Sequence, residues 1–254
     1  MKGLILSLAV GIIITVAVFP AMGALVDPQV LSNTNEQDML NVTVSILIFT
    51  PHPEMANREI MTRGTGTLVA HSGQNLILTH DHWEVIPETS TRARFLDADG
   101  RLLVEMGRKS FAALIRYQVG VSMLLSAPEG LIPDTLSSRT RRCIQVTMTT
   151  AALADGTEVK VGSVLLLARH IPQSDHQIGL LETVVEAVEV NDEHRILTLH
   201  SVNGTAVVPG DWDGGIWMDG RLIGNLWSRL LVQDLAGNTI EATDLMLAAI
   251  HPLG

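Results

Sequence analysis

The sequence predicts an all-β protein built in two halves. Short apolar segments recur along the 254-residue chain with turn residues between them, a pattern typical of sandwiches and barrels. Hydrophobic residues make up 46% of the chain and charged residues 17%, which suits a folded protein with a full core and excludes a disordered one. A stretch rich in Pro, Ser, Thr and Arg, 127–142, predicts a linker between an N-terminal half over 41–126 and a C-terminal half over 143–254.

The clearest single strand is Asn41–Phe49. Its apolar residues Val42, Val44, Ile46 and Ile48 recur at every second position, so they share one face of an extended chain. We expect this face to lie in the core of the N-terminal half.

Turn residues predict three hairpins and place several further strands. The hairpins turn at His71-Ser72-Gly73 (between Gly66–Ala70 and Leu76–Thr79), Asp99-Gly100 (between Arg94–Leu96 and Arg101–Met106) and Asp219-Gly220 (between Met218 and Arg221). Further strands are expected at Glu158–Ala168, Leu180–Val190, Arg195–Val202 and Arg221–Leu226.

One helix is expected, at the C-terminus. Thr243 or Asp244 can cap it, Leu245–Ile250 fill it, and Pro252 stops it. Residues 25–40 are polar and irregular, and they predict a linker or a loose strand.

The N-terminus has the pattern of an export signal. Lys2 precedes an apolar stretch over Leu4–Val18, and Pro20 is followed by the small residues Ala21 and Gly23. The segment 1–24 is therefore a signal peptide or, alternatively, an uncleaved membrane anchor, since a spanning helix needs roughly 20 apolar residues. In both cases we expect the folded part to be exported: periplasmic, extracellular or tethered to the outer side of the cytoplasmic membrane.

Charge and cysteine content exclude some functions. The formal net charge is -10, and sequence-independent nucleic-acid binding rests on Lys and Arg, so we expect no nucleic-acid partner. The single cysteine, Cys143, excludes an intrachain disulfide and a cysteine-based structural zinc site. We interpret it as a small buried hydrophobe.

Two segments resemble the trypsin-like serine proteases. Gly64–Val69 (Gly-Thr-Gly-Thr-Leu-Val) and Leu76–Trp83 (Leu-Ile-Leu-Thr-His-Asp-His-Trp) resemble that family's Gly-rich strand, hairpin and Leu-Thr-Ala-Ala-His-Cys motif. In this alignment His82 occupies the position of the catalytic histidine, and His80 and Asp81 replace the two alanines.

The second segment is Pro209–Trp217 (Pro-Gly-Asp-Trp-Asp-Gly-Gly-Ile-Trp), followed by Gly220–Gly224. It resembles the family's Gly-Asp-Ser-Gly-Gly-Pro nucleophile loop and the hairpin after it. The resemblance spans most of the chain from Asn41 onward. It implies two six-stranded antiparallel β-barrels, one motif in each barrel, and a short C-terminal helix.

In the same alignment, other residues occupy the positions of the family's nucleophile and aspartate. Asp213 occupies the position of the nucleophile serine, and Trp212 would occupy it if one residue is inserted. Asp211 occupies the glycine whose backbone N–H helps to form the family's oxyanion hole. In Tyr117–Leu125, which resembles the strand that carries the family's aspartate, Gly120 falls at the aspartate position. Neither a nucleophile nor an orienting acid remains, and two carboxylates would oppose a developing oxyanion.

The resemblance therefore implies a pseudoprotease that binds a protein or peptide through the former active-site cleft. The residues expected to line this cleft are Trp83, Asp211, Trp212, Gly214, Gly215 and Trp217. Alternatively, the tryptophans simply pack between the barrels, and His82 with Asp213 and Asp211 forms an inert ion pair.

Two other functions remain open from the residues alone. An active hydrolase with a displaced or unconventional nucleophile would still depend on His82. A metal-binding module could use His80, Asp81, His82 and the two loop aspartates, which offer N and O ligands. The favoured interpretation includes no cofactor and no metal.

Overall fold

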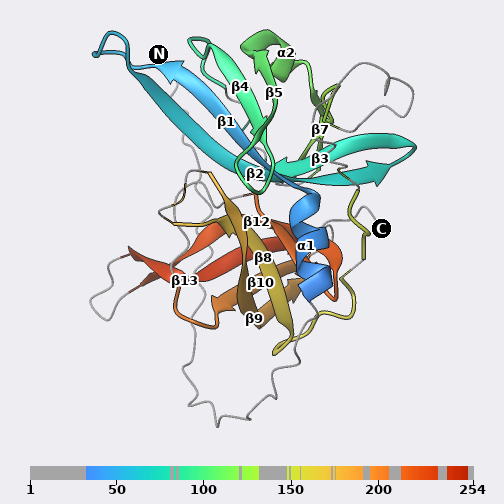
Figure 1. Cartoon of the computed structure of the whole chain (residues 1–254). Helices are drawn as coiled ribbons and strands as arrows, with labels where there is room; N and C mark the ends of the chain where they lie inside the picture. Colours follow the sequence, from blue (N-terminus) through green and yellow to red (C-terminus); the bar gives the residue numbers. More distant parts are fainter. Residues whose placement is uncertain are drawn as a thin grey trace, which may run out of the picture.

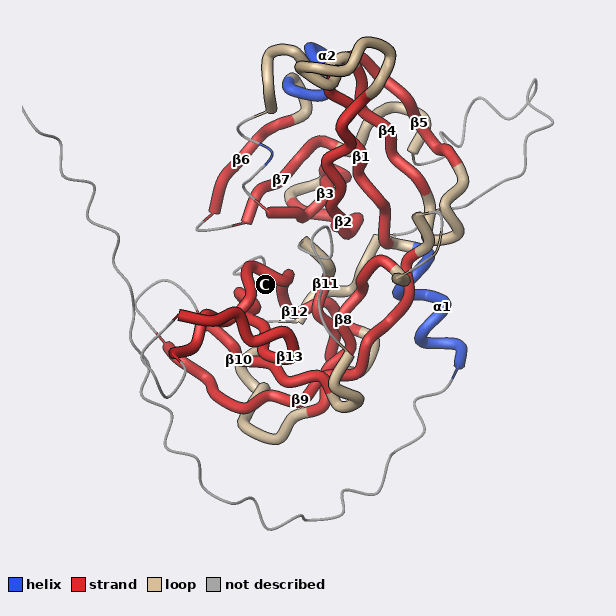
Figure 2. Tube along the Cα trace, turned by 90° about the vertical axis from the view of Figure 1, so that its left-hand side faces the viewer, coloured by secondary structure: helices blue, strands red, loops and turns tan. Residues whose placement is uncertain are grey.

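The structure, a computed structural model, consists of two β bodies that lie one above the other (Figures 1 and 2). The residues it describes are 33–80, 83, 86–119, 122–131, 148, 150–154, 156–172, 174, 176–190, 195–205, 213–233 and 239–250. The all-β fold of two halves predicted from the sequence is confirmed.

The N-terminal body is a curled antiparallel sheet of seven strands. The strands are β1 (Thr43–Pro51), β2 (Glu59–His71), β3 (Gln74–His80), β4 (Arg92–Leu96), β5 (Leu102–Gly107), β6 (Ile115–Val119) and β7 (Ser122–Ser126). They are ordered β5-β4-β1-β2-β3-β7-β6. A short helix, α2 (Arg108–Ala112), follows β5. The resemblance predicts six strands in this half, whereas the described sheet has seven, with β5 and β6 at its edges.

The C-terminal body is a closed six-stranded barrel, as the resemblance implies. Its strands are β8 (Val164–His170), β9 (Ile178–Val190), β10 (Arg195–Ser201), β11 (Gly215–Met218), β12 (Arg221–Gln233) and β13 (Thr239–Ile250). They close in the order β10-β13-β12-β11-β8-β9.

The predicted period-two strand and the hairpin turns form for local reasons. Val42, Val44, Ile46 and Ile48 are all at most 3% exposed and lie in the N-terminal core. At the turn Ser72-Gly73 both residues have positive φ, 49° and 74°, which is the geometry of a tight two-residue hairpin.

The other two predicted hairpins form in the same way. Asp219 and Gly220 have φ of 50° and 75°, and they join Met218 to its partner Arg221. Gly100, with φ of 83°, turns the chain between β4 and β5. Positive φ is tolerated best by Gly and Asn or Asp, which explains the composition of these turns.

The predicted C-terminal helix is wrong: Leu245–Ile250 belongs to strand β13. This segment pairs with β10, where Ile250 lies opposite Arg195, and with β12, where Ile250 lies opposite Gly224. A short apolar run does not by itself distinguish a buried helix from a buried strand. Pairing on both sides closes the barrel, and that tertiary gain decides the conformation.

The prediction of a linker or loose strand over 25–40 is also wrong in its second half. Helix α1 spans Asn33–Asn41, with Glu36 in its first turn. An Asn followed three residues later by a Glu is a capping pattern. Met39 is 2% exposed in the core, and the Thr43 Oγ1 donates to the Met39 carbonyl oxygen at 2.8 Å, so tertiary contacts hold the helix in place.

Several predictions fall outside the described residues. These are the signal or anchor segment 1–24, most of the predicted linker 127–142, and Cys143. Within the described part of the chain, no helix is both long enough and apolar enough to cross a bilayer.

The two bodies are joined by a shared core and by a bridging segment. Leu166, Trp217 and Leu222 of the C-terminal half pack in the core cluster of the N-terminal sheet. The Ala151 N–H donates to the Leu68 carbonyl oxygen at 2.8 Å, and the Leu222 N–H donates to the carbonyl oxygen of residue 152 at 2.8 Å. The segment 151–152, which precedes β8, thereby connects β2 of the N-terminal sheet with β12 of the barrel.

Candidate functional site

The segment Asp213–Gly215 lies at the junction of the two bodies, and it begins with Asp213. The Asp213 side chain is fully buried, with 0% exposure. A Cβ added at Gly64 of β2 would lie 2.2 Å from the Asp213 Oδ2 and 2.6 Å from the Trp83 Cζ2. Only a glycine at position 64 leaves room for both side chains. The two motifs that carry the resemblance therefore meet at Gly64.

The two loop glycines are required by close packing. A Cβ at Gly214 would lie 1.8 Å from the Ala168 carbonyl oxygen of β8. A Cβ at Gly215 would lie 2.5 Å from the Thr67 Oγ1 of β2. Because distances below 3.0 Å are not tolerated, the Gly-Gly pair is explained by the approach of this loop to both bodies.

The backbone of Asp213 is arranged differently from an oxyanion hole. In serine proteases of this fold the nucleophile's own backbone N–H stabilises the oxyanion. Here the Asp213 N–H donates to the Leu226 carbonyl oxygen at 3.2 Å, and the Leu226 N–H donates to the Gly214 carbonyl oxygen at 2.8 Å. Asp213 also has a positive φ of 80°. Its N–H is engaged within the barrel and is not directed at a substrate.

The tryptophans Trp83 and Trp217 are in the interior, with exposures of 1% and 2%. The Trp83 Nε1 donates to the Thr79 Oγ1 at 2.9 Å, and its ring meets Phe111 edge-on at a centroid distance of 6.0 Å. Trp217 belongs to the same core cluster. Both rings therefore pack in the interior of the protein at the junction.

A buried polar contact joins the bodies beside this loop. The Ser122 Oγ of β7 donates to the Asn225 Oδ1 of β12 at 2.6 Å. The Asn225 Nδ2 donates to the Thr79 carbonyl oxygen at 3.5 Å. Ser122, Thr79 and Asn225 are all at most 1% exposed, so the orientation of the bodies depends on this polar network.

One histidine that the sequence did not single out is buried at the junction. His170 ends β8 with 1% exposure, and its Nε2 lies 3.4 Å from the Ser45 Oγ and 3.4 Å from the Gly64 carbonyl oxygen. The partners Ser45 and His170 are 125 residues apart. No motif or spacing in the sequence predicts this contact.

The environment of His170 keeps its ring neutral. Burial is the main cause that lowers the pKa of His170 to about 4, and the Arg63 guanidinium is the second. A carbonyl oxygen only accepts, so the Gly64 contact favours the tautomer with its proton on Nε2. In that tautomer Nε2 cannot take a proton from Ser45, which a base in nucleophilic catalysis must do.

The remaining predicted site residues are not placed by the structure. His82, Asp81, Asp211, Trp212 and Gly120 lie outside the described residues. The contact predicted between His82 and Asp213 therefore stays a prediction. Within the described part of the chain, no three His, Cys, Asp or Glu side chains come together in a group that could hold a metal ion.

Comparison with known proteins yields matches to solved structures. The HtrA-type protease AlgW, solved with a tripeptide, matches with a TM-score of 0.55 and 12% identity, covering 87% of this chain and 60% of AlgW. The Rv3671c protease from M. tuberculosis, in its active form, matches with a TM-score of 0.55 and 12% identity, covering 93% of this chain and 89% of that protein. No protein-family profile matches the sequence. No curated protein matches it either.

These matches confirm the trypsin-like fold predicted from the two motifs. At 12% identity they establish the fold alone. The chain spans 60% of the length of AlgW, so the activity and the bound tripeptide of that protein are not carried over to this chain.

Proposed function

We propose that this chain is an exported, catalytically inactive protein of trypsin-like fold that binds a protein or peptide at the junction of its two bodies. The position of Asp213 carries the proposal. The motif alignment puts this buried carboxylate at the nucleophile position, and the backbone N–H of Asp213 donates to the Leu226 carbonyl oxygen. Losing the serine alone costs on the order of 10⁶-fold in subtilisin, a protease with the same catalytic triad.

Export is supported by the sequence of the N-terminal segment. Lys2, the apolar stretch Leu4–Val18 and the small residues Ala21 and Gly23 form the three parts of a secretory signal, or of an anchor. Digestion by protease added to cells whose outer layers are removed and whose cytoplasmic membrane is intact would test this part of the proposal. Digestion of the folded part only after the cytoplasmic membrane is broken would contradict it.

Peptide binding is assigned to the loop that ends in Asp213. Trp212 precedes this residue, and tryptophan is enriched at binding surfaces. We expect the ligand to contact Trp212 and Asp211, while Trp83 and Trp217 hold the loop from the interior.

The test is selection of peptides from a display library by the full chain, followed by fluorescence anisotropy. Trp212→Ala is expected to weaken an enriched peptide by about tenfold or more, the effect of removing one binding hot spot. Leu102→Ala, which truncates a residue of β5 that is 55% exposed, is the matched control and should bind as the wild type does. Selection that yields no enriched peptide, or binding unaffected by Trp212→Ala, would contradict the assignment.

An active hydrolase with a displaced nucleophile is the second candidate, because a hydroxyl and an imidazole do meet at Ser45 and His170. Their exposures of 0% and 1% oppose it, since a substrate could reach them only if the bodies separated. Peptide cleavage that is lost in Ser45→Ala would establish this candidate in place of the first.

A further inference from the structure

The hairpin of β1 and β2 projects beyond the strands on either side of it (Figure 1). Strand β3 pairs with β2 only over Thr67–His71, and β4 pairs with β1 only over Ser45–Phe49. Along its first residues, Glu59–Thr62, β2 has β1 on one side and no other strand of the described chain on the opposite side. This stretch is an open sheet edge.

The parity of the ladder shows which backbone groups point to that edge. The Leu68 N–H donates to the Val42 carbonyl oxygen at 2.8 Å, so the even-numbered residues of β2 direct their N–H and C=O groups at β1. The odd-numbered residues direct theirs to the other side, where the Thr79 Oγ1 donates to the Thr65 carbonyl oxygen. Glu59, Met61 and Arg63 therefore present their backbone groups to an added strand.

The edge lacks the proline, the lysine and the bulge that commonly prevent pairing. Residues 59–63 contain no proline and no lysine, and their register with β1 runs without a bulge. Ile60 and Met61 are 46% and 40% exposed, and Met55 at the hairpin end is 40% exposed. They are three of the nine exposed large apolar side chains in the described chain, and Ile60 and Met61 lie on opposite faces of β2 because side chains alternate along a strand.

The edge sequence Glu59-Ile-Met-Thr-Arg63 is complementary to itself in the antiparallel direction. We propose that β2 pairs with β2 of a second copy about a two-fold axis at Met61. Glu59 then lies opposite the partner's Arg63, and Arg63 lies opposite the partner's Glu59. All three of these cross-strand pairs are of the hydrogen-bonded kind, because their backbone groups face the added strand. A two-fold contact of this kind is isologous and closes as a dimer.

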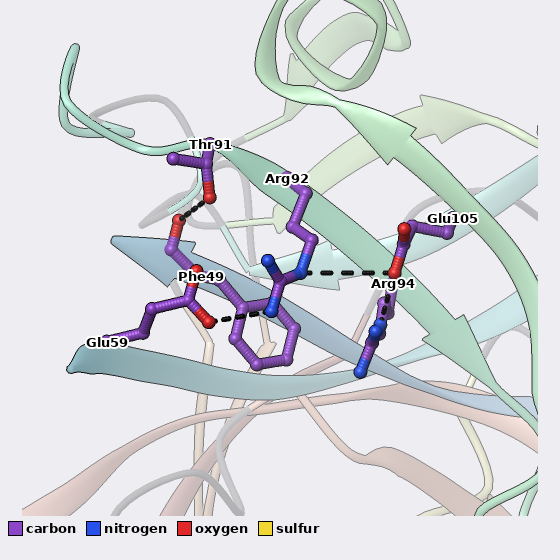
Figure 3. Close-up of polar contacts among 6 residues, drawn as sticks. All are labelled: Phe49, Glu59, Thr91, Arg92, Arg94 and Glu105. Carbon is purple, nitrogen blue, oxygen red and sulfur yellow. Dashed lines mark hydrogen bonds and ion pairs between the residues drawn. The ribbon is translucent and has the colours of Figure 1, made fainter. Parts of the chain in front are cut away.

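Glu59 already belongs to a polar cluster with Arg92 of β4, which lies on the other side of β1 from the open edge, as Figure 3 shows. Its Oε2 accepts from the Arg92 Nη2 at 2.6 Å, and the Arg92 guanidinium lies 4.5 Å from the Phe49 ring centroid. A carboxylate has about four lone pairs, and a guanidinium has five N–H donors. Glu59 and Arg63 can therefore each keep their contacts within the chain and form one more across the two-fold axis. Opposite charges directly across an antiparallel pair attract. In any other register Glu59 and Arg63 would not lie opposite each other, and this attraction would be lost.

Disulfide trapping in the full chain tests the register directly. In a Cys143→Ser background, Met61→Cys places two sulfurs across the axis, with Cα atoms about 5.5 Å apart, within the range a disulfide spans. Glu59→Cys is the matched control, since it lies on the same strand and face but its two copies are about 14 Å apart. We expect a disulfide-linked dimer with Met61→Cys and none with Glu59→Cys alone. Mixing Glu59→Cys with Arg63→Cys should restore cross-linking.

Charge reversal provides a second, independent measurement. Sedimentation equilibrium of the full chain in density-matched detergent should show a dimer that Glu59→Arg and Arg63→Glu each weaken about tenfold or more, since two symmetric pairs become repulsive. The double variant restores both pairs with the charges exchanged, and it should return to within about threefold of the wild type. A wild type that stays monomeric, Met61→Cys that links no better than Glu59→Cys, or a double variant as weak as the singles would overturn the proposal.

Discussion

At the scale of single residues, the junction is built from side chains that fit around glycines. Asp213 Oδ2 and the Trp83 ring both occupy the space beside Gly64, and the Gly214 and Gly215 backbones contact Ala168 and Thr67. The Gly-rich strand and the Gly-Gly loop are sequence features that active proteases of this fold share. In this chain they surround the buried carboxylate of Asp213.

Gly64→Ala should destabilise the protein by about 1–3 kcal/mol, the usual cost of forcing a methyl group into a packed site. The loss should be smaller when measured in an Asp213→Gly background, which removes one of the two clashing side chains. Chemical denaturation provides the measurement. Gly107→Ala is the control, because an added Cβ there meets no atom within 4 Å. Equal effects at positions 64 and 107 would contradict the packing described here.

His170 should make stability depend on pH. Its pKa is about 4 in the folded protein and near 6.5 when unfolded, so the unfolded chain binds more protons between these values. Stability from this group is complete above about pH 6.5, falls as the pH decreases, and levels off below about pH 4; the total is on the order of 3 kcal/mol. The charged and titratable groups around the ring, Arg63, Arg169 and His176, disfavour its protonation.

The measurement is the unfolding free energy of His170→Gln between pH 4 and 7. The variant should have a flatter pH dependence than the wild type, because its amide does not titrate. His71→Gln, at the β2–β3 turn, should leave the wild-type slope unchanged. A slope in His170→Gln as steep as in the wild type would show that other groups cause it.

Residues at the junction differ in how far the sequence predicts them. The place of Asp213 before two glycines is what assigns it to the nucleophile position in the motif alignment. The contact of His170 with Ser45 is not predicted, because no local pattern connects residues that meet only when the bodies dock. The burial of Trp83 and Trp217 is of the same kind, since it depends on packing contributed by the other half of the chain.

At the scale of elements, the sequence predicts correctly the turns and strands whose conformation depends on nearby residues. Turns such as Asp219-Gly220 fix their hairpins through positive φ, and β1 follows from its apolar alternation. The predicted helix over Leu245–Ile250 is wrong because pairing with β10 and β12 determines the conformation of β13. Helix α1 was missed because its main support, the burial of Met39 against the core, is tertiary.

The contact between β7 and β12 should be a measurable link between the bodies. Ser122→Ala removes the donor to a buried amide oxygen and should cost about 1–3 kcal/mol, the penalty of an unsatisfied buried group. Ser126→Ala, the same change on the same strand, removes a contact to the exposed Arg116 and should cost under about 0.5 kcal/mol. Thermal or chemical unfolding of both variants makes the comparison, and equal costs would contradict a structural link at Ser122.

At the scale of the whole molecule, the trypsin-like fold is a separate question from catalytic activity. The double β body of the trypsin-like proteases is present, with a closed C-terminal barrel and a curled N-terminal sheet. The motif alignment assigns the nucleophile position to Asp213, a residue that is buried and whose N–H is hydrogen-bonded within the barrel. These two observations support our proposal that the protein binds a protein or peptide and does not cleave it.

The most direct measurement is cleavage of a diverse peptide library by the full chain, read by mass spectrometry beside His82→Ala. Our account predicts that the wild type and the variant give the same background pattern, with no cleavage that depends on the histidine. Cleavage that the wild type performs and His82→Ala does not would contradict the central claim that this trypsin-like protein is inactive.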